Sequence, residues 1–315
     1  MPQATVKLNL VENLRVTGDD PQAIRKKVAE LVSTGEPKLK DIEKATSFGK
    51  STISQALSGK YQADDASILD AIARFYRYWV ARHTIVRTKT VEEIGAVIEL
   101  TWKRKEIGMV VGRFGRGKSE AALLYVAQHP DYARFIELSG ASSPMELLNK
   151  IAEALDIKDQ INGPAANRLA AIIRHLQRNP MLLIVDEADE LKPKSLKLLR
   201  DIHGDNQERC AIILIASDRL LRLLQNDDLG YLRSRIPIKR RIGDIDIDEA
   251  KQIADRFPHD LDRAEIKQAW DWSVKHDGIR SFVNLLKRAY DIMQMKDLGE
   301  IDSDCLKEAY SWLID

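Results

Sequence analysis

Apolar residues recur at helical spacing over both ends of the chain, whereas the middle part contains short continuous apolar runs. At the N-terminal end this periodicity predicts amphipathic helices separated by turn residues such as Gly35, Pro37 and Gly59. Polar residues 83–90 are expected to form a linker. After Asp246 the strand-like runs stop, and helical periodicity predicts a small all-helical lid. The expected helices span 23–31, 39–45, 51–57, 68–80, 91–102, 248–256, 262–275, 278–294 and 302–313.

In the middle part, apolar runs of strand length alternate with helical patterns. This alternation is typical of a parallel sheet covered by helices on both faces. We therefore predict an α/β fold preceded by an all-α domain, with boundaries at 1–88, 89–243 and 244–315. The expected strands span 107–112, 134–138, 181–186, 210–216 and 236–242, and the expected helices 118–128, 144–155, 164–178 and 193–203.

The N-terminal part contains a helix, a short turn at 46–50 and a second helix, which is the pattern of a helix-turn-helix. Residues 1–90 hold 15 Lys and Arg against 10 Asp and Glu, a basic bias that suits nucleic acid. Three-helix units that only pack against proteins share this pattern, so both interpretations stay open. The second helix has no Arg or Asn for bidentate base contacts, which favours phosphate-dominated binding of duplex DNA. The candidate DNA-binding residues are Lys50, Ser51, Thr52 and Gln55, with Ile53 facing the core.

A glycine-rich segment between the strand at 107–112 and the helix at 118–128 fits the pattern G-x-x-x-x-G-K-[ST]. Its strand–loop–helix setting predicts a phosphate-binding loop. Glycines let backbone N–H groups surround a phosphate, Lys118 supplies a positive charge to the β and γ oxygens, and the Ser119 hydroxyl ligates Mg²⁺. The candidate nucleotide-binding residues here are Gly112, Arg113, Phe114, Gly115, Arg116, Gly117, Lys118 and Ser119.

Two acids follow the apolar strand at 181–186, at the distance from the loop that is typical of a Walker B strand. Asp186 is expected to hold Mg²⁺ and Glu187 to polarise the water that attacks the γ-phosphate of ATP. Ser217 ends the next strand, at the edge of the sheet where ligands bind in open α/β folds. It either orients the same water or caps the helix that follows.

Basic residues provide the remaining candidates. Arg235, or its neighbour Arg233, is expected to reach the γ-phosphate held by another subunit, unless both belong to a solvated basic face. Arg280 stands at the start of a predicted helix, where a cation gains nothing from the helix dipole and an anionic partner is expected. A second candidate DNA surface, or a solvated stripe, is formed by Lys192, Lys194, Lys197 and Arg200.

Composition narrows the classes of protein. The chain has 315 residues, 44% of them hydrophobic, enough for buried cores in about two domains. It has no apolar run near the ~18 residues of a membrane span, and residues 1–10 contain no signal core. We expect a cytoplasmic protein without a membrane partner, in the host cytoplasm if a phage encodes it.

The motifs occur in the order of the AAA+ ATPases: the loop 112–119, Asp186 and Glu187, Ser217, Arg235 and then Arg280 before a helical lid. With the helix-turn-helix in front, the chain resembles the B proteins of transposable phage Mu and its relatives. The resemblance extends to residues 39–45, 51–54, 59–61, 184–189 and 234–236. Phe114 stands where these loops usually carry proline, Arg116 where they carry a small residue, and Ser217 where Asn or Thr is commoner.

The resemblance implies ATP-dependent, largely sequence-nonspecific binding of duplex DNA by a homo-oligomer, a helical filament or ring, with ATP between subunits. It implies that a transposase stimulates hydrolysis, with Glu187 and Lys118 catalytic, Ser217 the first sensor, Arg235 the finger and Arg280 the second sensor. Two other functions use the same motifs: a helicase loader or replication initiator, and a DNA-binding regulator that nucleotide switches without significant hydrolysis.

Overall fold

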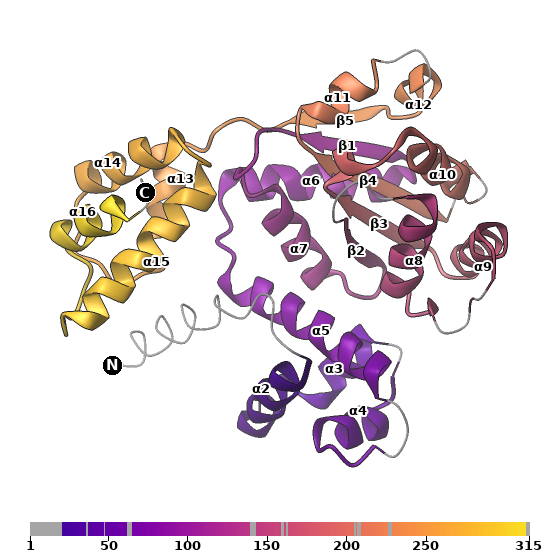
Figure 1. Cartoon of the computed structure of the whole chain (residues 1–315), viewed down its shortest axis with the longest axis horizontal. Coiled ribbons are helices and arrows are strands. Elements are labelled where there is room, and N and C mark those ends of the chain that lie inside the picture. The colour runs from indigo at the N-terminus through magenta and orange to yellow at the C-terminus, as the bar shows by residue number, and fades with distance from the viewer. Residues whose placement is uncertain are drawn as a thin grey trace.

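A five-stranded parallel sheet lies at the centre of the protein, with the strand order β2-β3-β4-β1-β5 (Figure 1). The structure, a computed structural model, describes residues 21–35, 37–46, 48–61, 65–138, 143–158, 161, 163–204, 206, 209–225 and 229–312. The central strands come from the continuous apolar runs, because a strand covered on both faces needs apolar side chains at every position. The strands are β1 Ile107–Val111, β2 Ala133–Glu137, β3 Met181–Asp186, β4 Cys210–Ala216 and β5 Ile238–Arg241.

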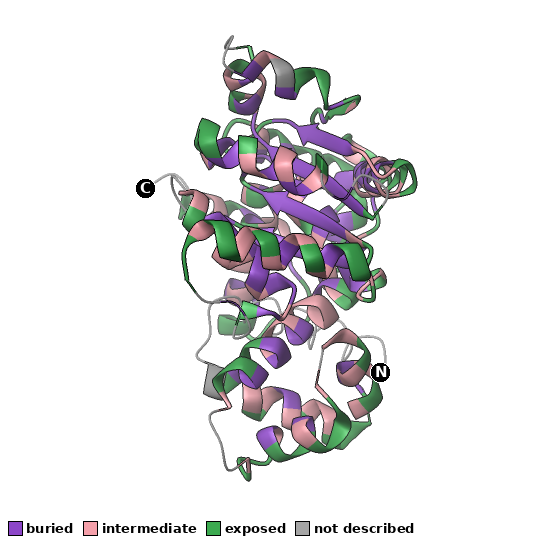
Figure 2. Cartoon of the chain, turned by 90° about the vertical axis from the view of Figure 1, so that its right-hand side faces the viewer, coloured by how far each residue is buried: buried purple, intermediate pink, exposed green. Residues whose placement is uncertain are grey.

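Helices cover both faces of the sheet, and alternate residues of each strand point to opposite faces. Met109 and Leu214 belong to the core on one face, whereas Val110 and Ile213 belong to the core on the other. Figure 2 shows the buried sheet between these layers. The first face packs against α8 Pro144–Ala154, α9 Ala165–Arg178 and α10 Pro193–Gly204, and the second against α6 Lys89–Arg104 and α7 Lys118–Gln128.

The N-terminal helices form a separate cluster below the sheet in Figure 1. Ile42, Ile53 and Ile72 are fully or almost fully buried there. The last of these helices continues through Thr84, so the connection to α6 is shorter than the predicted linker at 83–90. Its C-terminal half stays helical because Tyr78 packs against the core of the sheet. The helices are α2 Pro21–Thr34, α3 Leu39–Ala45, α4 Lys50–Leu57 and α5 Ala66–Thr84.

The C-terminal helices form the lid, which lies to the left of α7 and of the sheet in Figure 1. Three of them begin at an Asp whose carboxylate accepts hydrogen bonds from backbone N–H groups, as helix N-caps do: Asp246, Asp262 and Asp302. The lid helices are α13 Ile247–Ala254, α14 Arg263–Val274, α15 Ile279–Met295 and α16 Ser303–Ser311. Within the described ranges, no helix combines the length and the apolar character that a membrane span needs.

Among the described residues, three short helical segments connect these parts: η2 Ala188–Glu190 after β3, α11 Arg219–Leu223 after β4, and α12 Gly230–Ser234 before β5. The predicted fold class is confirmed, because the parallel sheet, the helices that cover it and the helical lid are all present.

Candidate functional site

The phosphate-binding loop lies between β1 and α7, with Gly115 and Gly117 at positive φ (70° and 73°). Lys118 begins α7, and its Nζ donates hydrogen bonds of 2.8 Å to the carbonyl oxygens of Gly112 and Arg113. Burial lowers the pKa of Lys118, while the charge of Asp186 raises it. The ammonium group is thus held inside the loop, where it faces the carboxylates at the end of β3.

Asp186 and Glu187 lie at the carboxyl end of β3, next to the loop. Asp186 is only 4% exposed and accepts a hydrogen bond from the Ser119 hydroxyl. Burial raises the pKa of Asp186, and the Ser119 hydrogen bond opposes that shift. Glu187 is more open, and first its partial burial and then the negative charge of Asp186 raise its pKa. Both effects increase the proton affinity of Glu187, as a general base requires.

Ser217, at the end of β4, makes hydrogen bonds to Asp189 after β3 and to the start of α11. Its hydroxyl donates to Asp189 Oδ2 at 2.5 Å and accepts from the backbone N–H of Arg219 at 3.2 Å, at the start of α11. Its own backbone N–H donates to Asp189 Oδ1 at 3.1 Å. Ser217 therefore fixes the start of α11 and joins a buried carboxylate that lines the same pocket.

These residues line a cavity of ≈ 270 Å³ between the sheet, the α5–α6 connection and the lid. One part of its wall is polar and contains Lys118, Ser119, Asp186 and Glu187. Another part is apolar and was not predicted from the sequence, because its side chains come from three distant segments that share no motif. The apolar residues are Val86, Val91, Ile253, Phe257, Ile279 and Val283.

Comparison with known proteins finds a matching family model and two similar phage proteins. The model of the family described as "AAA domain" matches residues 101–224. The chain is 25% identical over 300 residues to the "ATP-dependent target DNA activator B" of Escherichia phage Mu, covering 91% of this chain and 94% of that protein. It is 26% identical, with the same coverage, to the protein of that name from Escherichia phage D108. The chain has the AAA+ fold and is similar over nearly its whole length to the B proteins of phages Mu and D108.

Solved structures with a similar fold include two proteins of Aeropyrum pernix. The ORC2 protein of Aeropyrum pernix, with bound ADPNP and ADP, aligns with a TM-score of 0.56 at 18% identity, over 70% of this chain and 67% of that one. The ORC1 protein of the same organism, in complex with DNA, aligns with a TM-score of 0.57 at 16% identity, over 76% and 69%. At these identities the likeness concerns the fold.

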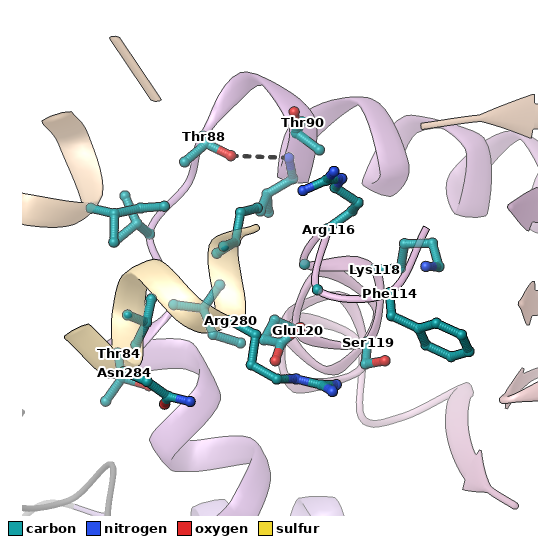
Figure 3. A pocket seen from close by; sticks show the side chains of 18 of the residues that line it. Thr84, Thr88, Thr90, Phe114, Arg116, Lys118, Ser119, Glu120, Arg280 and Asn284 are labelled. Carbon is teal, nitrogen blue, oxygen red and sulfur yellow. Dashed lines mark hydrogen bonds between the residues drawn. The ribbon is translucent and has the colours of Figure 1, made fainter. Parts of the chain in front are cut away.

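The arginines expected at an AAA+ site occupy two different places. Arg280 extends from α15 into the pocket, and Figure 3 shows it reaching toward Ser119 while Phe114 points away. Arg233 and Arg235 are exposed at the end of α12 and are not among the residues that line the pocket. The structure thus brings Arg280 to the phosphate loop of its own chain but leaves Arg233 and Arg235 outside that pocket.

The predicted DNA-binding residues lie on two separate surfaces. In α4, Lys50, Ser51 and Gln55 are exposed, Thr52 is half-buried and Ile53 is buried, as expected for a helix with one face to the core. Lys50 pairs with Glu43 of α3 at 3.4 Å. On the second surface, Lys192 precedes α10, Lys194 and Lys197 are exposed on it, and Arg200 pairs with Asp201.

Proposed function

We propose that this protein is an ATPase that binds duplex DNA in an ATP-dependent and largely sequence-nonspecific manner, assembles on it as an oligomer and presents it to a transposase. The observation that carries the proposal is the convergence of Lys118, Asp186 and Arg280 on one cavity, in a chain similar over nearly its whole length to proteins named ATP-dependent target DNA activator B.

The cavity suits a nucleoside triphosphate. The apolar wall offers a surface for the base, as apolar and aromatic side chains commonly do in ligand sites. The loop backbone and Lys118 bind the phosphates at the opposite part of the wall, at the N-terminus of α7, where backbone N–H groups attract anions. The apolar wall comes from the lid as well as from the core. Nucleotide therefore contacts both parts and stabilises them against each other.

The residues present also fit Mg²⁺. Ser119 and Asp186 already face each other through a hydrogen bond, and oxygen ligands of this kind are those that Mg²⁺ prefers. A cation there would favour the charged form of Asp186, whose burial otherwise disfavours it. When bound, Mg²⁺ neutralises negative charge on the phosphates. Ser119 and Asp186 are the residues that would hold it.

Hydrolysis needs a base and a source of positive charge. Glu187 polarises the attacking water, with its proton affinity raised by burial and by Asp186. Arg280 supplies positive charge from the lid of the same subunit. Arg235 supplies further positive charge to the cavity of a neighbouring subunit, since it does not line the cavity of its own chain. Ser217 and Asp189 also line this cavity and orient the attacking water.

DNA binding is assigned to the exposed residues of α4 and to the basic face of α10. Phosphate contacts from lysine and hydroxyl side chains position a protein on DNA without reading its sequence. The alternative of a replication initiator receives less support. The ORC proteins share the fold at 16–18% identity, whereas the transposition proteins match over nearly the whole chain.

The proposal predicts ATP-stimulated, salt-sensitive binding to duplexes of unrelated sequence, measured by fluorescence anisotropy with ATP, ADP and no nucleotide. We expect affinity to fall about a hundredfold or more between low and moderate salt, because counterions are released from several phosphates. Lys118→Ala should lose the ATP stimulation. Equal binding in all three nucleotide states would contradict the proposal.

A further inference from the structure

Arg116 belongs to the phosphate loop, yet its side chain is buried away from solvent. Only 2% of it is exposed, and it is the largest fully buried side chain among the described residues. Its Nη2 forms an ion pair with Asp244, in the segment that connects β5 to the lid. Its Nη1 is buried and has no hydrogen-bond partner within the described part of the chain. The guanidinium is thus paired with Asp244 in the β5–lid connection, and Asp244 does not line the nucleotide cavity.

The start of α15 touches the phosphate loop at backbone distance. The backbone N–H of Ile279 donates to the carbonyl oxygen of Gly115 at 2.9 Å. A Cβ on Gly115 would lie 1.6 Å from the carbonyl oxygen of Asp277, and a Cβ on Gly278 would lie 1.8 Å from Arg116 Nη1. Both glycines also have positive φ. Only glycine permits this contact, so loop and lid are fitted to each other at this point.

This contact fixes where Arg280 lies, because Arg280 is in the first turn of α15, two residues after Gly278. We propose that Gly115, Arg116, Asp244 and Gly278 form a lid clamp that holds α15 against the phosphate loop and thereby positions Arg280 over the phosphates. Arg116 is then a positioning residue. The inference rests on the proposed function, because the role of Arg280 is proposed there.

The clamp is sensitive to the Arg116–Asp244 pair in particular. A buried guanidinium needs its counter-ion, since an unpaired buried charge strongly disfavours the conformation that buries it. Loss of Asp244 therefore favours movement of the lid away from Gly115. The lid stays attached even then, because Glu249 of α13 accepts a 2.7 Å hydrogen bond from the backbone N–H of Thr90. Loss of the clamp shifts the lid and leaves it folded.

The first test needs no nucleotide. Hydrogen–deuterium exchange of the Ile279 amide is compared in the wild-type chain and in Asp244→Asn. The matched control is Asp248→Asn, which breaks an exposed lid pair with Arg263 at 2.7 Å. We expect exchange at Ile279 about tenfold faster in Asp244→Asn and unchanged in the control, because the hydrogen bond to Gly115 opens more often. Equal exchange in all three proteins overturns the clamp, whether or not the protein hydrolyses ATP.

The second test concerns Arg280. We expect Asp244→Asn to lower kcat about tenfold or more, as misplacement of a positioned group does, and to leave ADP affinity unchanged. In an Arg280→Ala background the same substitution should have no further effect. A full effect in that background, or weaker ADP binding, overturns the positioning role. Asp244→Glu keeps the charge and should retain most of the wild-type kcat. A wild-type chain without ATPase activity counts against the proposed function, while the exchange measurement still decides on the clamp.

Discussion

At the scale of single residues, Glu187 differs from the other acids of the segment 186–190. Its backbone is left-handed, with φ 53° and ψ 37°, and its side chain lines the cavity. Glu190, three residues on, does not line it and pairs with Arg219 at 2.9 Å. The local sequence Asp-Glu-Ala-Asp-Glu therefore contains acids that line the cavity and, in Glu190, an acid that forms a surface ion pair.

Replacing Glu187 with Gln should lower the ATPase rate by about 10²–10⁴, the usual contribution of a general base. ATP binding should persist, because Lys118 and Ser119 are unchanged, and oligomers should remain trapped on DNA. Phosphate release and DNA retention measure the two effects. Glu190→Gln is the matched control and should hydrolyse ATP at the wild-type rate. A Glu187→Gln protein with the wild-type rate would rule out the catalytic assignment.

At the scale of elements, α5 connects the N-terminal helices to the core. Arg74 forms an ion pair with Asp156, and their side chains are 26% and 12% exposed. One turn later, Arg77 lies over the ring of Phe135, 5.4 Å from its centroid, and pairs with Glu137 at 2.8 Å. Burial raises the pKa of Asp156, while Arg74 opposes that shift. The helix thus docks through one largely buried pair and one open pair.

Breaking these two pairs should have different consequences. Arg74→Ala leaves Asp156 largely buried without its partner, so we expect a loss of about 1–3 kcal/mol in the free energy of unfolding. Arg77→Ala, its matched control on the same helix, removes a half-exposed pair and should cost about 1 kcal/mol or less. Urea unfolding measures both. Equal losses would show that burial of the Arg74–Asp156 pair does not stabilise the docking of α5.

The elements also show what the sequence could predict. The strands were readable because central parallel strands are apolar at every position, and the AAA+ fold is confirmed. The helix α12 was missed, and α11 was anticipated only through the possible cap at Ser217, because five residues are too few for a helical period to be visible. The linker was predicted too long because packing of Tyr78 on the core, which extends α5, is a tertiary contact.

The site also contains residues that the sequence could locate and residues that it could not. Lys118, Ser119, Asp186 and Glu187 could be located because each belongs to a local motif at a strand end, and their roles stay predictions. The apolar wall and the Arg116–Asp244 pair could not be found, since they join segments far apart in sequence. A single Arg in a glycine-rich loop indicates charge near the phosphates. Only the fold shows that this charge is directed to the lid connection.

At the scale of the whole molecule, the residues proposed for hydrolysis are divided between two regions. The cavity lies between the core and the lid, whereas Arg235 lies at the end of α12, before the edge strand β5. Head-to-tail association of identical subunits joins two different surfaces and generates rings or filaments. Such an arrangement would bring Arg235 of one subunit to the cavity of the next, so that each complete site needs two chains.

Mixing two inactive variants tests this arrangement. Lys118→Ala has a defective phosphate loop but an intact Arg235, and Arg235→Ala has the reverse. Each alone should be nearly inactive, whereas an equal mixture should regain about a quarter of the wild-type ATPase activity, because one random interface in four combines both intact halves. Arg233→Ala in place of Arg235→Ala identifies which arginine acts. A mixture no more active than its components would contradict a finger supplied by the neighbouring subunit.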